Sequence, residues 1–191
     1  MRIVAGQLRG RQLLTPPGDR TRPTAARARE ALFSILGDVS SGRVLDLYAG
    51  SGALGFEALS RGAPELTLVE ASKAAQRAIR ANITALGLET RATLLPLRAE
   101  ASFGALGRLA PFCLVFADPP WADFERALRV LEDLAASPLL DPASRLVLEH
   151  AARNTPVPKP TSRLRAYETR HWGDTGVTLF EILPGPAPIS G

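Results

Sequence analysis

The sequence has few of the residues that build disulfide frameworks, metal clusters or membrane spans. Its 191 residues include one cysteine, Cys113, and two histidines, so no intramolecular disulfide can form and no metal-cluster spacing is present. The longest apolar runs, such as 112–117, are far shorter than the roughly 20 residues that cross a bilayer. Glycine and arginine residues follow directly after Met1 to Val4, so we expect no apolar core of a signal peptide. We therefore expect a cytoplasmic protein with no metal and no membrane contact.

Lysine is also scarce, and nearly all of the positive charge is arginine. Lys and Arg total 23 against 19 Asp and Glu, a net charge of +4. The first 30 residues hold a dense group of arginines, opposed there only by Asp19 and Glu30: Arg2, Arg9, Arg11, Arg20, Arg22, Arg27 and Arg29. The guanidinium fork matches phosphate oxygens, which suits a polyanionic partner. A GC-rich or thermophilic genome would enrich arginine equally, and composition does not separate the two.

The periodicity predicts an α/β fold that begins with a small extension. Residues 2–15 are expected to form a β-hairpin with turns at Gly6 and Gly10, and residues 24–36 a helix capped by Thr24. From residue 43, short apolar strands alternate with helices, which predicts a mostly parallel sheet covered on both faces. The expected strands are 44–47, 66–70, 92–97, 112–117 and 145–149, and the expected helices are 53–61, 72–86 and 124–136. Period two returns at 163–170 and 177–183, which predicts a closing antiparallel hairpin and seven strands in all.

A glycine-rich loop after the first strand indicates a nucleotide-type cofactor. Gly50, Gly52 and Gly55 form G-x-G-x-x-G between a strand and a helix, and Glu70 ends the next strand, where it can accept hydrogen bonds from two ribose hydroxyls. A dinucleotide site would share these features. Asp46 distinguishes the two, because a carboxylate beneath the loop repels a pyrophosphate and suits a cationic amino-acid moiety. The pattern D-x-x-x-G-x-G therefore favours S-adenosylmethionine.

A second motif, Asp118-Pro119-Pro120-Trp121, follows the expected strand 112–117. Two successive prolines end the strand in a rigid loop at the sheet edge where α/β proteins bind ligands. The Asp118 carboxylate and a loop carbonyl, for which Pro119 is our choice, would orient an exocyclic base amine, and Trp121 offers a face on which a flipped-out base can stack. Because the sulfonium is already an excellent leaving group, positioning the amine for in-line attack supplies much of the remaining reduction of the activation barrier. No metal is required.

With both motifs in place, the sequence resembles the bacterial 16S rRNA guanine-N2 methyltransferase family over residues 1–183. The resemblance includes the segments 2–6, 9–11, 22–24, 27–33, 46–52 and 118–121. The two catalytic motifs are shared with many amino-methyltransferases, so the amino-terminal arginine pattern is what singles out this family among them. The resemblance implies a Rossmann-like class I fold, S-adenosylmethionine as cofactor, and 16S rRNA in a 30S subunit or assembly intermediate as partner of a monomer. It also implies three segments: an RNA-binding, cofactor-covering extension (1–37), a catalytic domain (38–183) and a flexible tail (184–191).

The resemblance also implies roles for single residues. Asp46, Tyr48, Ala49, Gly50, Ser51 and Gly52 would line the methionine side of the cofactor and Glu70 its ribose, while Arg22, Pro23 and Thr24 would close over it. Asp118, Pro119, Pro120 and Trp121 would hold the guanine, and Arg2, Arg9, Arg11, Arg20 and Arg27 would meet RNA phosphates. The chain departs from the family's pattern at the position that binds the adenine of the cofactor. Relatives often carry Asn or Asp before Ala, whereas this chain has Ala99-Glu100, so Glu100 or a backbone group takes that role.

Three other interpretations stay open at this stage. An adenine-N6 or other RNA or DNA amino-methyltransferase would have a nearly identical catalytic loop. An NAD(P)-dependent oxidoreductase would use the three glycines but leave Asp46 and Asp118 without a role. A non-catalytic RNA-binding protein would not need the complete set of loop residues. His150, His171 and Trp172 are expected to be structural.

Overall fold

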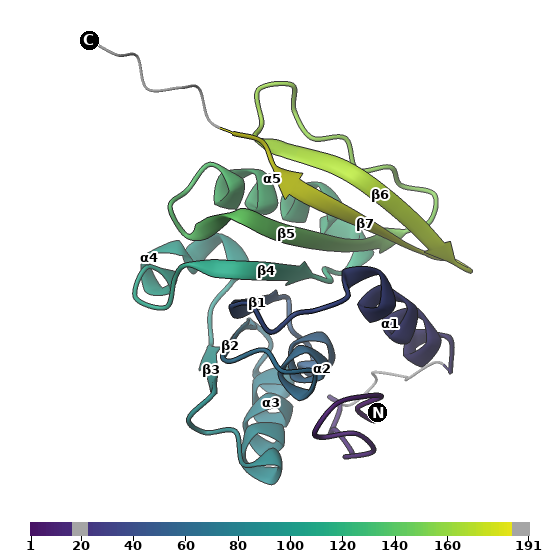
Figure 1. Cartoon of the computed structure of the whole chain (residues 1–191), viewed down its shortest axis with the longest axis vertical. Helices are drawn as coiled ribbons and strands as arrows, with labels where there is room; N and C mark the ends of the chain where they lie inside the picture. The colour runs from purple at the N-terminus through teal and green to yellow at the C-terminus, as the bar shows by residue number, and fades with distance from the viewer. Residues whose placement is uncertain (17–22, 185–191) are drawn as a thin grey trace.

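A computed structural model describes residues 1–16 and 23–184, and one mixed sheet organises them (Figure 1). The strands are β1 (Arg43–Leu47), β2 (Leu66–Val69), β3 (Ala92–Leu95), β4 (Phe112–Ala117), β5 (Leu140–Ala151), β6 (Leu164–Trp172) and β7 (Thr175–Ile182). Their order is β3-β2-β1-β4-β5-β7-β6. The pairs among β1 to β5 are parallel, and β7 runs antiparallel to both β5 and β6. The predicted parallel sheet with a closing antiparallel hairpin is confirmed.

Helices cover both faces of the sheet (Figure 1). The helices are α1 (Pro23–Leu36), α2 (Ala53–Ser60), α3 (Lys73–Leu86), α4 (Phe103–Leu106) and α5 (Phe124–Ala135), with 3-10 turns η1 (Ala99–Ala101) and η2 (Trp121–Asp123). One hydrophobic cluster joins α1, α2 and α3 to the first face, and a second joins α4 and α5 to the other. β4 serves both, because Leu114 and Phe116 face the first cluster while Val115 and Ala117 face the second. This two-sided burial explains why the strand is continuously apolar.

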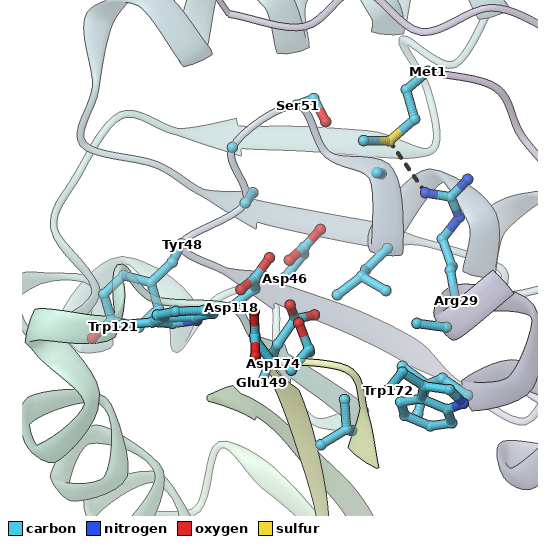
Figure 2. A pocket seen from close by; sticks show the side chains of 18 of the residues that line it. Met1, Arg29, Asp46, Tyr48, Ser51, Asp118, Trp121, Glu149, Trp172 and Asp174 are labelled. Atoms are coloured by element: carbon cyan, nitrogen blue, oxygen red, sulfur yellow. Dashed lines mark hydrogen bonds between the residues drawn. The ribbon is translucent and has the colours of Figure 1, made fainter. Parts of the chain in front are cut away.

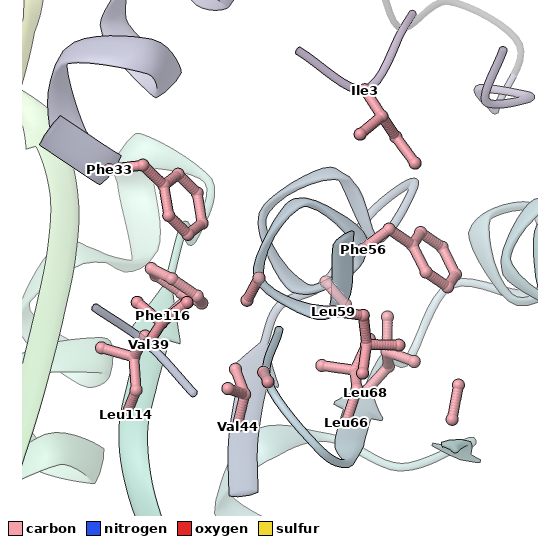
Figure 3. Packing of buried hydrophobic residues seen from close by; sticks show 14 of the residues in the cluster. Ile3, Phe33, Val39, Val44, Phe56, Leu59, Leu66, Leu68, Leu114 and Phe116 are labelled. Carbon is pink, nitrogen blue, oxygen red and sulfur yellow. The ribbon is translucent and has the colours of Figure 1, made fainter. Parts of the chain in front are cut away.

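Figure 3 shows the first cluster, where α1 meets the sheet. Phe33 of α1 packs on Phe116 of β4 with ring centroids 5.7 Å apart, and both side chains are almost fully buried. Phe56 of α2 fills the space beside Leu68 of β2 in the same cluster. The burial of such rings contributes most of the stability that holds α1 and α2 over the carboxyl ends of the strands.

The amino-terminal segment differs from its prediction. Residues 1–13 turn back on themselves, but Arg2 and Gln12 form a single bridge in place of two paired strands. Its two ends bond to each other, since Ile3 N donates to Arg11 O (3.1 Å) and Leu13 N donates to Met1 O (2.8 Å). The turn between them bonds to α2: Gln7 N donates to Ser60 O (2.7 Å), and Leu8 N to the Ser60 hydroxyl (2.9 Å). The predicted hairpin is thus present as two short paired ends around a turn held by α2, and not as two regular strands over 2–15.

The proposed division into segments 1–37, 38–183 and 184–191 stays a prediction. Ile3, Leu13 and Phe33 from the first segment share one hydrophobic cluster with the sheet. Residues 185–191 lie outside the described residues. Within 1–16 and 23–184, no helix is long and apolar enough to cross a bilayer. The same ranges contain no group of three His, Cys, Asp or Glu side chains arranged to hold a metal ion.

Candidate active site

Two adjoining cavities lie at the carboxyl ends of the parallel strands, where α/β sheets bind ligands. The first has a volume of about 530 Å³ and is lined by the glycine loop, α1 and the β6–β7 turn. The second, of about 560 Å³, is lined by the residues that follow β2, β3 and β4. Tyr48, Gly50, Asp118 and Trp121 border both. Each volume is within the range of small-molecule sites, and the shared border allows one ligand to extend from one cavity into the other.

The glycine loop is fixed by Asp46 near the carboxyl end of β1. The side chain of Asp46 is 2% exposed, and its Oδ2 accepts a hydrogen bond from Gly55 N at 3.0 Å. A Cβ at Gly55 would lie 2.6 Å from Leu66 Cδ1, so only glycine lets α2 approach the sheet this closely. Burial, with Asp118 and Glu70 nearby, raises the pKa of Asp46 well above its usual value. A cation in the first cavity would stabilise the ionised form of the buried Asp46 carboxylate.

Glu70 ties the loop to the end of β2. Its Oε2 accepts from Gly50 N at 2.8 Å, and its Oε1 accepts from Ser72 N at 2.6 Å. Ser72 caps α3, so one carboxylate sets both the loop and the start of that helix. Each carboxylate oxygen can accept a further hydrogen bond, and Glu70 lines the second cavity. It therefore has acceptor capacity toward a pair of hydroxyl groups there.

Tyr48 stands at the junction of the two cavities in an unusual conformation. It is the one described non-glycine residue with positive φ, at 56°, which costs of the order of 1–3 kcal/mol. Its hydroxyl is buried and has no hydrogen-bond partner within the described part of the chain. Burial is the main cause that raises the pKa of Tyr48 to about 12. The tight turn before Gly50 thus places Tyr48, with its unsatisfied hydroxyl, where the two cavities meet.

The far end of the second cavity contains the residues expected at cofactor adenine. Ala99 and Glu100 both line it, on the turn η1 after β3. Glu100 Oε1 lies 3.5 Å from Arg126 Nε, and Arg126 also bonds to Asp123 at 3.0 Å. The Glu100 carboxylate is thus turned toward an arginine of α5. The choice between Glu100 and a backbone group as the adenine contact stays open.

The Asp-Pro-Pro-Trp loop leaves β4 at the centre of the site. Pro119 is buried, Pro120 is extended (φ −51°, ψ 136°), and Asp123 N closes the turn η2 on Pro120 O at 2.7 Å. The indole of Trp121 is 40% exposed, which is unusual for so large a side chain. The loop thus holds Asp118 and Trp121 on a rigid frame between the two cavities.

Two further carboxylates in the first cavity were not expected from the sequence. Figure 2 shows Asp46, Asp118, Glu149 and Asp174 gathered between Trp121 and Trp172. Glu149 lies near the end of β5, and Asp174 lies in the β6–β7 turn. Burial and the Asp118 carboxylate raise the pKa of Glu149 to about 8. No motif marks Glu149; only the strand register, which pairs Ala117 with Leu148, could have placed it beside Asp118.

The comparisons with known proteins agree with this geometry. The family described as "Conserved hypothetical protein 95" matches residues 1–181. The chain belongs to this family. It is 39% identical over 136 residues to ribosomal RNA small subunit methyltransferase D of Escherichia coli (strain K12), covering 70% of this chain and 67% of that protein. It is 34% identical to the putative rRNA methyltransferase YlbH of Bacillus subtilis (strain 168) over 184 residues, covering 95% and 98%.

A solved structure gives the same result for the fold. The Thermus thermophilus protein TTHA0928 superposes with a TM-score of 0.78 at 33% identity, covering 95% of this chain and 99% of that one. The family membership and the class I methyltransferase fold expected from the motifs are both confirmed. The fold alone would not choose a substrate, since one scaffold supports many reactions.

The amino-terminal segment is held against α2, the helix that follows the glycine loop. The fully buried Glu57 of α2 accepts hydrogen bonds from Val4 N (2.8 Å), Ala5 N (3.0 Å) and Arg61 Nε (2.9 Å). Arg29 Nε of α1 lies 3.5 Å from Glu57 Oε2, an ion pair too long to be a hydrogen bond. From the sequence, no role was assigned to Glu57, and Arg29 was named only as one of the amino-terminal arginines, whereas its side chain is buried.

Asn82 makes a second link between the extension and the loop. Its amide accepts from Leu14 N (2.8 Å) and donates to Leu14 O (3.0 Å) and Ser51 O (3.1 Å). Pro16, two residues farther along, lines the second cavity. The chain that continues from there contains Arg20 and Arg22, which lie outside the described residues. The backbone of Pro23 and Thr24 begins α1, and closure of this segment over the cofactor stays a prediction.

The other predicted arginines lie on the surface. Arg2, Arg9, Arg11 and Arg27 are exposed, as phosphate contact requires. Arg11 has an additional structural contact, because its Nη2 donates to Ala85 O near the end of α3 at 2.5 Å. His150 packs inside the protein, with its ring nitrogens 2.9 Å from Ala151 O and from the Thr178 hydroxyl. Trp172 packs partly against the core but also lines the first cavity, so its position exceeds the structural role expected for it.

Proposed function

We propose that this protein transfers a methyl group from S-adenosylmethionine to the exocyclic N2 of a guanine in 16S rRNA. The observation that carries the proposal is the placement of Asp46 and Asp118 at the ends of adjacent strands, bordering one cavity together. Asp46 suits a cationic cofactor, and Asp118 suits an amine that reacts with it. The name of the E. coli relative, ribosomal RNA small subunit methyltransferase D, supports the RNA class.

The residues present fit the cofactor. Buried Asp46 with a raised pKa favours a cationic ligand group in the first cavity, and Glu70 offers acceptors to ribose hydroxyls in the second. Tyr48 contributes a buried hydroxyl that lacks a protein partner within 1–16 and 23–184. When bound, S-adenosylmethionine supplies an electrophilic methyl group on a sulfonium centre. The protein's part is to orient that group toward the Asp118 loop and to exclude water.

The Asp118 loop performs the work on the amine. An exocyclic base amine is a weak nucleophile because its lone pair is delocalised into the ring. Asp118 and the Pro119 carbonyl accept hydrogen bonds from its two hydrogens, which orients the lone pair and stabilises the positive charge that develops on nitrogen. As the N–C bond forms, the nitrogen loses one proton, and the Asp118 carboxylate accepts it. Trp121 stacks on the base and fixes its plane.

A ribosomal substrate also accounts for the surface. Exposed Arg2 and Arg27 adjoin Met1 and Ala28, which line the first cavity, and exposed Arg9 lies farther along the extension. Phosphate contacts there would hold rRNA while one base enters the cavity. We place the reaction on a 30S subunit or an assembly intermediate, carried out by a monomer in the cytoplasm.

The test is methyl transfer to defined particles. The protein is incubated with isotopically labelled S-adenosylmethionine and 30S particles from cells that lack it, and the RNA is digested to nucleosides. We expect label in N2-methylguanosine at one position. Naked 16S rRNA and 50S particles serve as matched substrates, and less label in both would support the assembled subunit as substrate.

Two results would contradict the proposal. Label in N6-methyladenosine would keep the fold and the loop chemistry but give the wrong base. No label in RNA, with cofactor binding demonstrated by calorimetry, would exclude an RNA substrate under these conditions and direct the search to DNA and protein.

A further inference from the structure

Glu149 is a cavity residue to which the proposed chemistry gives no role. Ala117 of β4 pairs with Leu148 of β5 in a parallel register, so Asp118 and Glu149 come next on adjacent strands. Neighbouring strands are about 4.8 Å apart. Both residues line the first cavity, and Figure 2 shows their carboxylates side by side in it.

The alternation of β5 explains why Glu149 faces the ligand space. Val147 belongs to the cluster under α1 and α2, whereas Leu148 belongs to the cluster under α5. Successive side chains point to opposite faces of a strand, so Glu149 returns to the face on which α1 and the first cavity lie. His150 then turns back toward α5, where its ring packs 5.8 Å from Phe124. Glu149 is thus aimed into the cavity by the strand itself.

Two neighbouring carboxylates in a partly buried space require hydrogen-bond donors or cations from a ligand. The raised pKa of Glu149 expresses the same requirement in the free protein. Guanine presents N1–H directly beside its N2 amino group, so its edge carries adjacent donors. Adenine presents an acceptor, N1, beside its N6 amino group. An ionised carboxylate accepts hydrogen bonds only, so this pair matches guanine and disfavours adenine.

We propose that Glu149 is a specificity-determining residue that accepts a hydrogen bond from guanine N1–H while Asp118 holds the N2 amino group. This inference rests on the proposed function, because it assumes a guanine in the first cavity. Trp121 and Trp172 border the same cavity on opposite sides of these carboxylates (Figure 2), so an aromatic face is available to a base there. Any proton on Glu149 in the free protein leaves to solvent when guanine binds.

The consequence is discrimination between bases that carry the same amine. 2,6-Diaminopurine has the N2 amino group of guanine, but its N1 is an acceptor. A hydrogen bond to a charged group contributes about 1.5–3 kcal/mol, and an unmatched buried pair costs a similar amount. That corresponds to a preference of roughly tenfold to more than a hundredfold for guanine.

The experiment uses 16S rRNA ligated with either guanine or 2,6-diaminopurine at the position located by the labelling assay, assembled into 30S particles. Single-turnover methylation is measured for the full-length wild type, Glu149→Gln and the exposed control Glu89→Gln. We expect wild type and the control to prefer guanine at least tenfold. Glu149→Gln should lose rate on guanine and gain relative to wild type on 2,6-diaminopurine, because its amide N–H can donate to N1. Cofactor binding, measured by calorimetry, should be retained.

Each outcome separates this inference from the proposed function. If wild type methylates guanine but Glu149→Gln keeps the wild-type preference, the role of Glu149 is overturned and the function stands. If the variant does not fold, the wild type alone decides, since equal rates on the two bases would overturn the inference. If wild type forms no N2-methylguanosine on the guanine particles, the proposed function fails and this inference fails with it.

Discussion

The carboxylate of Asp118 repels those of Asp46 and Glu149 in the free protein, and this repulsion favours ligands that bring positive charge or N–H donors. Burial and mutual repulsion raise the pKa of both Asp46 and Glu149. Such arrangements occur where chemistry is performed, because a stable core would avoid them. A cationic cofactor and a base with N–H donors would relieve the repulsion together, so the cavity favours a ternary complex over either ligand alone.

Asp118 provides the first test at this scale. Asp118→Ala should lower single-turnover methylation at least about 100-fold, because an acceptor that orients and deprotonates the amine is lost. Cofactor binding, measured by calorimetry, should be retained, because Asp46 and Glu70 still border the two cavities. The exposed Asp133→Ala serves as control. Activity near the wild-type level in Asp118→Ala would remove the catalytic role.

Glu149 should also leave a signature in stability. A carboxyl whose pKa is higher in the folded state, about 8 against 4.5, stabilises the protein fully below pH 4.5. That contribution is lost between pH 4.5 and 8 at up to about 1.4 kcal/mol per pH unit, reduced by solvent screening. The thermal stability of wild type should therefore fall relative to that of Glu149→Gln across this window, and the difference should become constant above pH 8.

The groups facing Glu149 set the size of this effect. They are Asp118 at the end of β4, Asp46 in β1, Asp174 in the β6–β7 turn and Arg29 in α1, all of which line the cavity. A constant stability difference between wild type and Glu149→Gln from pH 5 to 8 would show that the carboxyl titrates normally and faces solvent.

Single residues were predictable where a motif carried them. Asp46, Gly50 and Asp118 follow from spacing, because a loop between strand and helix needs those residue types in that order. Glu149 was not predictable in this way, since its role depends on register with a strand some thirty residues away. The buried ion pair of Arg29 with Glu57 was not predictable for a related reason, because the two residues come close only in the folded chain.

The extension and α2 form one unit at the scale of elements, and Glu57 holds it together. Glu57→Ala should destabilise the protein by about 3–5 kcal/mol, because it leaves Arg29 as a buried charge without a counter-ion and removes the acceptor of two backbone N–H groups. Denaturant unfolding measures the change. The matched control is Glu65→Ala, whose ion pair with Arg43 is exposed and contributes about 0–1 kcal/mol. Equal losses in the two variants would contradict the anchoring role.

The close approach of α2 to β1 and β2 is the second element-level feature. Gly55→Ala would place a Cβ 2.6 Å from Leu66 Cδ1 and 3.0 Å from Asp46 Oδ2. We expect a loss of about 1–3 kcal/mol in stability from overpacking and weaker cofactor binding from the displaced carboxylate. Gly104→Ala, where no atom lies within 4 Å of the added Cβ, should change neither. Wild-type cofactor affinity in Gly55→Ala would show that Asp46 does not meet the cofactor.

The strands and helices were predictable from periodicity because each buries one face or both. β4 and β7 were expected within two residues of their bounds. The amino-terminal hairpin was predicted only in part, since its ends pair with each other but other backbone groups of the segment bond to Ser60 and Glu57 on α2. Local patterns do not reveal such distant partners.

The whole molecule carries a modest net charge of +4. For RNA binding, the position of the arginines on the surface matters more than the size of this net charge. Exposed Arg9 is the clearest candidate for a phosphate contact, because Arg11 also supports the end of α3. Arg9→Ala should weaken RNA binding and lower the slope of log K against log salt by about 0.7–0.9. Cofactor affinity should stay constant. Arg108→Ala, exposed in the turn between α4 and β4, is the control. An unchanged slope in Arg9→Ala would exclude phosphate contact there.

The central claim is most directly tested in cells. Nucleoside mass spectrometry would be applied to 16S rRNA from cells that lack the gene and from the same cells complemented with wild type or Asp118→Ala. We predict that deletion removes N2-methylguanosine at one position, that wild type restores it, and that Asp118→Ala does not. Unchanged N2-methylguanosine after deletion, or full restoration by Asp118→Ala, would contradict the account.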